Sequence, residues 1–513
     1  MNFRYVGRQL GLLTLVLSGV MCVVAIWAAV QVAGGHAEEL AARNALLLSV
    51  AVTVLLSGAL RLAGGRFEGQ LARREALLLV AASWLVGAAL AALPFRLWAW
   101  LEADAAIADP AFGSWINCYF EAISGFTTTG ATVLTKIESI PRSLLLWRAT
   151  THWLGGLGIV VLFVAVLPML GVGSKRVFRV ESPGPTPEGV TPRIQEAARI
   201  LWLIYFGLTV AEIATLKLLG LDWFSSVCHT FATLATGGFS TLNASLGQMN
   251  RAAIDAAIIV FMLLAGVNFG LYYQLIHRRW RSVRDDPELR TYLAILGVGC
   301  LIIVISIYRL PIVTTTGDTI EPSLFATLRY GVFQVVSIQT TTGFCTAEFD
   351  HWPFVAKATL VILMFVGASG GSTGGGIKVV RCLIAAKVLI GEIERIFRPN
   401  VVRPVRVGNT TVAPEQRLAA VSYLLGIAVL FVVGTVLIKA LETDRPISVV
   451  TAATAAAATL NNIGPGLAEV SAVDNYAWFS APSKVVMSLL MVIGRLEVFA
   501  IIVLFHPRFW RKE

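Results

Sequence analysis

Long apolar segments follow one another along almost the whole 513-residue chain, with short polar stretches between them. A helix needs about 20 apolar residues to cross the hydrocarbon core of a bilayer, and runs of that length recur throughout. The first two, Gly11–Val32 and Ala45–Leu62, have no counterpart later in the chain. The pattern predicts an all-α polytopic membrane protein that begins with two N-terminal transmembrane helices.

After these two helices, one unit recurs four times, and each unit has an outer helix, a short re-entrant segment, a turn and an inner helix. We expect the units at residues 71–175, 176–285, 286–400 and 401–513, after the leading pair at 1–70. The predicted outer helices are Ala76–Leu93, Ile200–Leu219, Tyr292–Leu310 and Leu418–Leu441. The short segments are Trp115–Phe126, Trp223–Leu234, Leu324–Gln339 and Ile447–Leu460. The inner helices are Leu144–Leu170, Ala253–Ile276, Phe354–Leu389 and Lys484–Phe505.

The turns that follow the short segments carry the repeated signal. Their core residues are Thr128, Thr129 and Gly130; Ala235, Thr236 and Gly237; Thr341, Thr342 and Gly343; and Asn462, Ile463 and Gly464. One Thr-Gly pair is an ordinary helix-end turn, but these glycines lie 107, 106 and 121 residues apart, which indicates an internal repeat. Non-helical backbone at membrane depth must be shielded by protein or face water. We therefore expect four pseudo-symmetric helix–pore-loop–helix units around one central pore.

Converging turns of this kind suit a monovalent cation, because rings of backbone carbonyls can replace its hydration shell. Glycine permits backbone conformations that are closed to other residues, so the four turns can direct carbonyl groups inward. Glu121 and Gln334 each lie nine residues before their turn glycine, and we expect both to brace the short helices. His152 and His229 stand among apolar residues and are expected to be core histidines.

The third inner segment contains a glycine-rich stretch, and it is not a phosphate-binding loop, because Ile377 separates Gly376 from Lys378 and no strand precedes it. It predicts a break in a membrane helix that faces a cavity or other protein. A packing kink between close helices is the alternative. The residues singled out in this stretch are Gly370, Gly371, Gly374, Gly375, Gly376 and Lys378.

Arg495 interrupts the last apolar segment. An arginine at the centre of a membrane helix costs about 2.5–3.5 kcal/mol on insertion scales, so we expect it to face water or a partner. An ion pair with Glu497 is one alternative, although residues two apart on a helix do not face each other. The other is a position inside the protein that faces water.

The net charge of +10 is distributed unevenly, because basic clusters occupy alternate loops. The positive-inside rule then predicts cytoplasmic termini and outward-facing turns. This placement argues against nucleic acid as a partner and favours anionic lipid or an acidic protein. The six cysteines form no metal-ligand spacing, and we find no catalytic constellation, so neither an enzyme nor a cofactor is expected.

Three segments, Phe120–Thr132, Gln339–Phe344 and Asn461–Gly466, resemble the filter segments of Trk-type potassium uptake proteins, the TrkH/KtrB membrane subunits of the potassium-transporter superfamily. The two leading helices favour the TrkH branch. The resemblance implies potassium uptake across the bacterial inner membrane through a four-loop selectivity filter, gated by the glycine-rich loop and Arg495. It also implies a homodimer and a cytosolic nucleotide-binding, TrkA-like regulatory ring.

An ion-coupled potassium symporter, driven by protons or sodium with alternating access, is the alternative function. Carriers of that type use inverted repeats and membrane carboxylate pairs. The repeats here run parallel in topology. In the fourth turn, Asn462 and Ile463 replace the two threonines of the first, which predicts a less strict selectivity.

Overall fold

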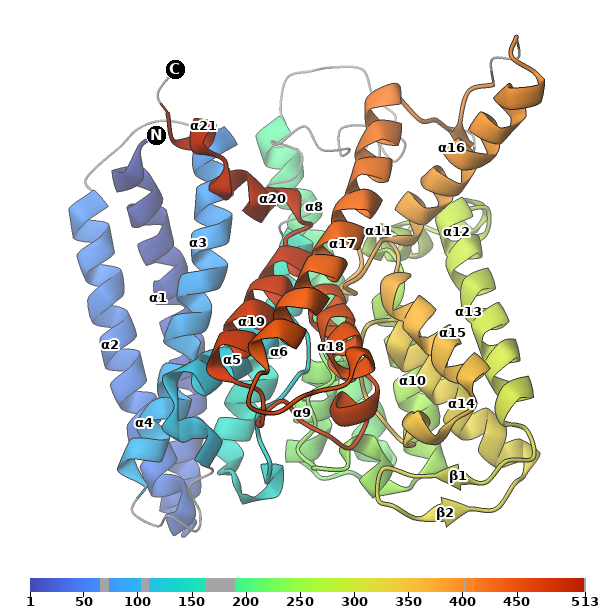
Figure 1. The fold of residues 1–513 in the computed structure, drawn as a ribbon. Coiled ribbons are helices and arrows are strands. Elements are labelled where there is room, and N and C mark those ends of the chain that lie inside the picture. Colours follow the sequence, from blue (N-terminus) through green and yellow to red (C-terminus); the bar gives the residue numbers. More distant parts are fainter. Residues whose placement is uncertain (65–72, 103–109, 162–189, 401–402, 409, 512–513) are drawn as a thin grey trace.

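The computed structural model describes residues 1–64, 73–102, 110–161, 190–400, 403–408 and 410–511. Long helices dominate, and the two termini lie at the same end of the molecule (Figure 1). The predicted all-α polytopic fold is confirmed. The expected unit limits at residues 70/71 and 175/176 and residue 401 lie outside the described residues, as does the expected first inner helix beyond residue 161.

The leading pair, α1 (Phe3–Ala33) and α2 (Leu40–Gly64), forms an antiparallel hairpin. Small residues bring the two backbones close, as they do in other membrane helix pairs. A β-carbon built on Gly11 would lie 2.8 Å from the Ser57 carbonyl oxygen, and the hydroxyls of Thr14 and Ser57 are 2.8 Å apart. The hairpin packs against α3 and α4 at one side of the molecule.

Four units of outer, short and inner helix follow. The outer helices are α3 (Arg73–Ala91) continued by α4 (Leu93–Leu101), α8 (Val190–Leu218), α13 (Pro287–Ile307) and α17 (Pro414–Leu441). The short helices are α5 (Trp115–Phe126), α9 (Trp223–Leu234), α14 (Leu324–Gln339) and α18 (Val449–Asn461). The first three have the predicted bounds, and the fourth begins two residues later than expected. At 1.5 Å per residue, even the 16-residue α14 is about 24 Å long, too short to cross a bilayer.

The inner helices differ from the prediction, because three of them are broken. The first is α6 (Arg142–Val161), and the others are α10 (Ala252–Gly266) with α11 (Phe269–Ile276), α15 (Phe354–Phe365) with α16 (Val379–Phe397), and α19 (Ala481–Arg495) with α20 (Phe499–Ile502). Only the break in the third was expected. The second bends by 95° and the fourth by 114°. Asn268 caps α11 by accepting from the Gly270 N–H, and Glu497 and Val498 both have positive φ angles.

The remaining elements are short; all but the C-terminal α21 lie in connections between the helices. They are α12 (Trp280–Arg284), α21 (Pro507–Trp510), and the antiparallel pairs β1 (Ile312–Val313) with β2 (Thr319–Ile320) and β3 (Arg406–Val407) with β4 (Thr410–Thr411). The 3₁₀ turns are Ala37–Glu39, Pro110–Gly113, Ile137–Ser139, Ser245–Met249, Phe349–His351, Ala468–Val470 and Val503–Phe505.

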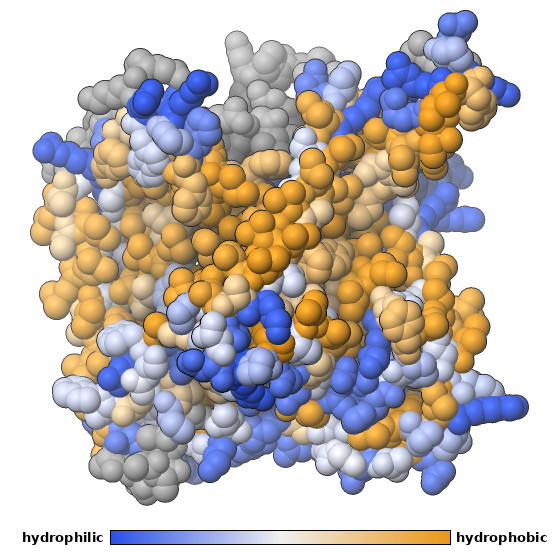
Figure 2. All heavy atoms as spheres, viewed as in Figure 1, coloured by the Kyte–Doolittle hydropathy of each residue, from blue (hydrophilic) through white to orange (hydrophobic). Residues whose placement is uncertain are grey.

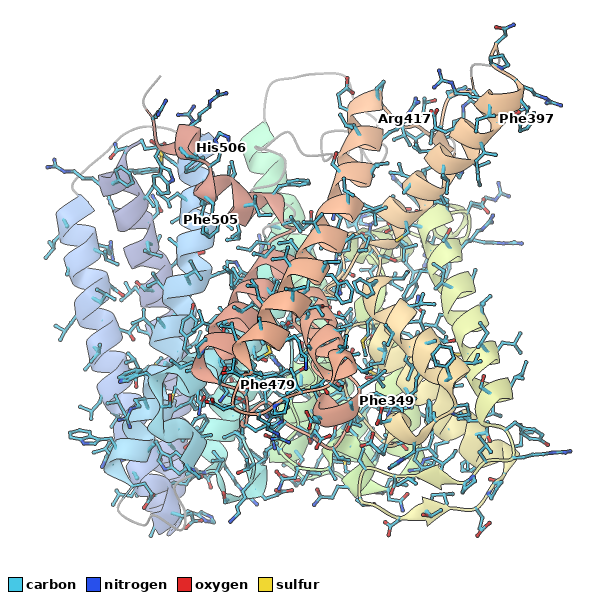
Figure 3. The ribbon with its side chains drawn as sticks, in the orientation of Figure 1. Phe349, Phe397, Arg417, Phe479, Phe505 and His506 are labelled. Carbon is cyan, nitrogen blue, oxygen red and sulfur yellow. The ribbon has the colours of Figure 1, made fainter. Side chains whose placement is uncertain are left out.

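The surface agrees with a membrane position. Apolar side chains cover the middle of the visible face, and hydrophilic residues gather toward both ends (Figure 2). Among the described residues, six helices are long and apolar enough to cross a membrane, or up to eight if each bent pair counts as one span. Phe349 and Phe479, which follow the third and fourth turns, lie toward the end opposite to Arg417 and His506 (Figure 3). The turns therefore open away from the termini.

Candidate functional site

The four short helices end in the same way. In each, a backbone N–H just past the helix bonds back five residues to a carbonyl: Thr129 to Ser124 (2.8 Å), Gly237 to Ala232 (2.8 Å), Thr342 to Ser337 (2.9 Å) and Ile463 to Ala458 (3.0 Å). The residue before each donor has a left-handed φ of 51 to 60°: Thr128, Thr236, Thr341 and Asn462. This is the Schellman ending of a helix, which normally places glycine or asparagine at the left-handed position. The shared backbone shows that the four turns are structural equivalents.

This equivalence corrects the register of the second turn. Two residues after each left-handed position stands a glycine with φ between 78 and 95°: Gly130, Gly238, Gly343 and Gly464. The sequence repeat pairs Gly237 with Gly130, but in the structure Gly238 occupies that place and Gly237 corresponds to Thr129. Ala235 corresponds to Thr127, the last residue before the left-handed position. The adjacent glycines 237 and 238 made the one-residue shift invisible in the sequence.

The four turns close into one ring. A β-carbon built on Gly130 would lie 2.2 Å from the Gly237 carbonyl oxygen, one on Gly238 2.0 Å from that of Thr342, and one on Gly343 1.8 Å from that of Ile463. One on Gly464 would lie 2.8 Å from the Thr129 carbonyl oxygen, which returns the sequence of contacts to the first turn. Each glycine thus leaves room for a backbone carbonyl of the next turn. All four turns surround a single axis.

Glu121, buried in α5, holds the first turn from behind. Its carboxylate accepts from the Val133 N–H (2.9 Å) and the Thr132 hydroxyl (2.9 Å), so the expected bracing role agrees with the geometry. Its partner was not predicted: Arg148 in α6 donates through Nε to the Glu121 carboxylate over 2.6 Å. Arg148 also donates to the Ser240 carbonyl (2.9 Å) and lies 3.4 Å from the Phe239 ring centroid. It therefore ties the first turn to the second.

His229 is the counterpart of Glu121 in the second unit, because it lies nine residues before Gly238. Its Nε2 is 3.1 Å from the Ser240 hydroxyl just past the turn. Gln334 holds the same place in the third unit, and its amide oxygen, correctly oriented, accepts from the Thr346 N–H over 2.8 Å. The fourth unit has Ala455 there, and the Tyr476 hydroxyl instead donates to the Gly464 carbonyl (2.7 Å). His229 is buried, as expected, but it contacts the turn.

The glycine-rich segment between α15 and α16 lies against one side of this ring. The Gly375 N–H donates to the Thr341 hydroxyl (2.6 Å), and the Thr236 hydroxyl donates to the Thr373 carbonyl (3.0 Å). A β-carbon on Gly375 would lie 2.5 Å from the Asn461 carbonyl oxygen, and one on Gly374 3.2 Å from that of Thr340. The segment therefore contacts the second, third and fourth turns together.

The remaining candidate glycines shape this segment and tie it to neighbouring helices. Gly371 and Gly376 have φ angles of 72 and 64°, in the left-handed region that favours glycine. The Gly371 carbonyl accepts from Phe269 at the start of α11 (3.1 Å), and the Lys378 ammonium donates to the Gly374 carbonyl. Gly370 is the first of these candidate glycines along the chain, and its N–H donates to the Glu288 carboxylate of α13 (2.6 Å).

Arg495 connects the glycine-rich segment to the first unit, the remaining one of the four. Its guanidinium, at the C-terminal end of α19, donates to the Thr373 carbonyl (2.8 Å) and to the Gly155 carbonyl of α6 (3.4 Å). It is 2% exposed, and no carboxylate within the described ranges lies at ion-pair distance from it. The arginine joins the glycine-rich segment of the third unit to the inner helix of the first.

The alternative ion pair between Arg495 and Glu497 is wrong. Glu497 instead pairs with Arg381 of α16, and it lies in the break between α19 and α20, where Glu497 and Val498 have positive φ angles. Arg381 also lies 4.1 Å from the Tyr423 ring centroid. A small cavity remains between the glycine-rich segment and the end of α19. It is lined by Gly374, Gly375, Gly376, Lys378, Gly494, Arg495 and Glu497.

In the part of the chain that the structure describes, no three His, Cys, Asp or Glu side chains come together as metal ligands. Within the four turns themselves, the polar groups are backbone amides and carbonyls, threonine hydroxyls and one asparagine amide. The Asn462 amide donates to the Thr129 hydroxyl (3.0 Å) and to the Met491 carbonyl (2.9 Å). Such neutral oxygen donors suit an alkali cation that passes through, because they release it more readily than carboxylates do.

Comparison with known proteins identifies close relatives. The family model described as TrkH, cation transport protein, matches residues 43–512. The Trk system potassium uptake protein TrkH of Escherichia coli K12 is 40% identical over 403 residues, which cover 77% of this chain and 80% of that protein. TrkH of Vibrio parahaemolyticus is 36% identical over 415 residues, covering 79% and 82%. The crystal structure of the potassium transporter TrkH from Vibrio parahaemolyticus covers both chains fully at 31% identity, with a TM-score of 0.86.

Proposed function

We infer that this chain, which belongs to the TrkH family of cation transport proteins, takes up potassium across the bacterial inner membrane. Its curated relatives are named as potassium uptake proteins, so a transporter and not an enzyme is the conclusion, with potassium as the substrate and no cofactor. The observation that carries the more detailed proposal is the closed ring of four equivalent turns around one axis.

We propose that potassium sheds its water inside this ring, at turns 128–130, 236–238, 341–343 and 462–464. Backbone carbonyl oxygens replace the hydration shell without any titratable group. The four short helices end at the ring, so their C-terminal ends, each with about half a negative charge, favour a cation there. The membrane potential supplies about 2.3 kcal/mol per 100 mV for each inward cation, so uptake needs no chemical step.

The glycine-rich segment and Arg495 serve as the gate in this proposal. The segment contacts three turns on one side of the ring, and Arg495 links it to the inner helix of the remaining unit. A cation leaving the ring on this side meets a fixed positive charge. Displacement of the segment would open the path and separate Arg495 from the Thr373 carbonyl.

We further propose that the end with the two termini faces the cytoplasm. Exposed Arg278, Arg279, Arg281 and Arg284 lie around α12 and supply the basic surface that the positive-inside rule expects there. A cytosolic nucleotide-binding ring with an acidic face is the regulatory partner that suits this surface. The functional assembly is proposed to be a homodimer in the membrane.

Rubidium uptake in a potassium-auxotrophic bacterial strain tests the transport proposal. Cells that express the wild-type chain should take up rubidium and grow at low potassium. Gly343→Ser should reduce uptake or selectivity, because its side chain would meet the Ile463 carbonyl. Arg495→Ala should raise cation leak. Unchanged transport in both variants, at wild-type expression, would refute the pore assignment.

A further inference from the structure

Glu288, in the first turn of α13, is bonded to both ends of the glycine-rich segment. One carboxylate oxygen accepts from the Gly370 N–H over 2.6 Å and from the Val380 N–H over 3.2 Å. Gly370 lies near the start of the segment, and Val380 lies in the first turn of α16, directly after it. A single side chain from a third helix therefore holds the two ends together.

These bonds are of a strong type. In its ionised form the carboxylate strengthens them, because hydrogen bonds to a charged acceptor are roughly twice as strong as those between neutral groups. The carboxylate also sits at the N-terminal end of α16, where the helix dipole favours negative charge. The Val380 N–H is one of the first-turn donors of α16 that have no partner within the helix. Moving the segment away from the ring therefore requires these bonds to break or Glu288 to move with it.

Glu288 also stands next to the proposed cytoplasmic surface. The exposed helix α12 precedes α13 by two residues, and Asp286 caps α13 by accepting from the Leu289 N–H (2.7 Å). We call the connection between α12 and α13, residues 284–287, the α12–α13 elbow. Arg290 stabilises this elbow, because it donates to the Arg284 carbonyl (2.8 Å) and pairs with Asp285 (2.6 Å). A displacement of α12 is thus carried through a short, bonded connection to the residue that holds the segment.

We propose that Glu288 is the positioning residue that latches the glycine-rich segment against the ring and transmits movements of the α12–α13 elbow to it. This role rests on the proposed gate. It adds a structural connection through which the basic surface around α12, more than 80 residues earlier in the chain, can act on that gate. An acidic partner bound at Arg281 and Arg284 would pull the elbow and release the segment.

Purified protein in liposomes tests this latch without any partner present. The three proteins are wild type, Glu288→Gln and Glu415→Gln. Glu415 is the matched control: it follows proline in the first turn of α17, as Glu288 does in α13, but it is exposed. Glu288→Gln should raise rubidium flux about 10-fold, equal to about 1.4 kcal/mol, with unchanged rubidium-to-sodium preference. Glu415→Gln should match the wild type.

Equal and measurable flux in the wild-type and Glu288→Gln proteins would overturn the latch, whereas no rubidium flux through any of the three folded proteins would count against the proposed function itself. A second variant covers the case in which Glu288→Gln does not fold. Glu288→Cys with Gly370→Cys, bridged by a short thiol cross-linker, should suppress flux, and cleavage of the bridge should restore it. Full conduction with the bridge in place would also overturn the proposal.

Discussion

Gly343→Ala is expected to disturb the ring more than any other single added methyl group in the four turns. Gly343 has a φ of 80°, which an alanine adopts only at a cost of about 1–2 kcal/mol. Its new β-carbon would lie 1.8 Å from the Ile463 carbonyl oxygen, whereas ordinary contacts begin near 3.4 Å. The obstacle is backbone and not a flexible side chain. The fourth turn must therefore shift by more than an ångström.

The same comparison ranks two further variants. Gly464→Ala brings its methyl only to 2.8 Å from the Thr129 carbonyl oxygen, so its effect should be smaller. Gly297→Ala in α13 is the control, because nothing lies within 4 Å of the added carbon and alanine favours a helix. We expect Gly343→Ala to reduce rubidium-over-sodium preference at least 10-fold, equal to about 1.4 kcal/mol.

Competitive uptake of rubidium and sodium into liposomes, at several membrane potentials, measures this preference. The amount of folded protein is first equalised by size-exclusion chromatography. Wild-type selectivity in a folded Gly343→Ala protein would show that the Ile463 carbonyl does not line the ion path. A larger loss in Gly464→Ala than in Gly343→Ala would contradict the ranking by distance.

Three other predictions concern the surroundings of the ring. Arg148→Met should leave the Glu121 carboxylate buried without its partner and lower the free energy of unfolding by about 3–5 kcal/mol. The double variant with Glu121→Gln should recover part of this loss. Thermal unfolding in detergent measures both effects. Arg495→Ala should raise potassium leak through the partner-free protein, and an unaltered leak in flux assays would contradict its role in the gate. Burial raises the pKa of Glu348, outside the membrane-spanning helices, above 4.5. Between about pH 4.5 and this raised pKa, the folded protein holds a proton on Glu348 that the unfolded chain has lost, so the stability should fall as the pH rises through this range. Glu348→Gln should flatten this decline in thermal unfolding scans. An equal decline in both proteins would refute the assignment.

The sequence predicted the short helices well, because each is a compact apolar segment that ends at a Thr-Gly turn or, in the fourth unit, at Asn-Ile-Gly. It failed on the register of the second turn, because Gly237 and Gly238 both satisfy the repeat. The left-handed residue of the helix ending, which fixes the register, has no unique residue type here: it is threonine three times and asparagine once. With the wrong register, the correspondence of His229 with Glu121 and Gln334 was hidden.

Partners that come from distant parts of the chain were not predictable. Arg148 meets Glu121 across two helices, and Arg381 meets Glu497 over a separation of 116 residues. No local pattern distinguishes these arginines from others in apolar surroundings. The breaks after Gly266 and Arg495 also depend on tertiary contacts, such as the bond from Phe269 to the Gly371 carbonyl. The sequence is apolar on both sides of each break, so the hydrophobic pattern alone predicts an unbroken helix at both places.

Because one chain supplies all four turns, every position in the ring is encoded only once. In a pore built from four identical subunits, a single codon change alters all quadrants together. Here Ala455 and Tyr476 in the fourth unit replace the brace that Glu121 gives the first, while the other quadrants keep their own. Natural variation can therefore adjust the affinity of such a pore for alkali ions one quarter at a time.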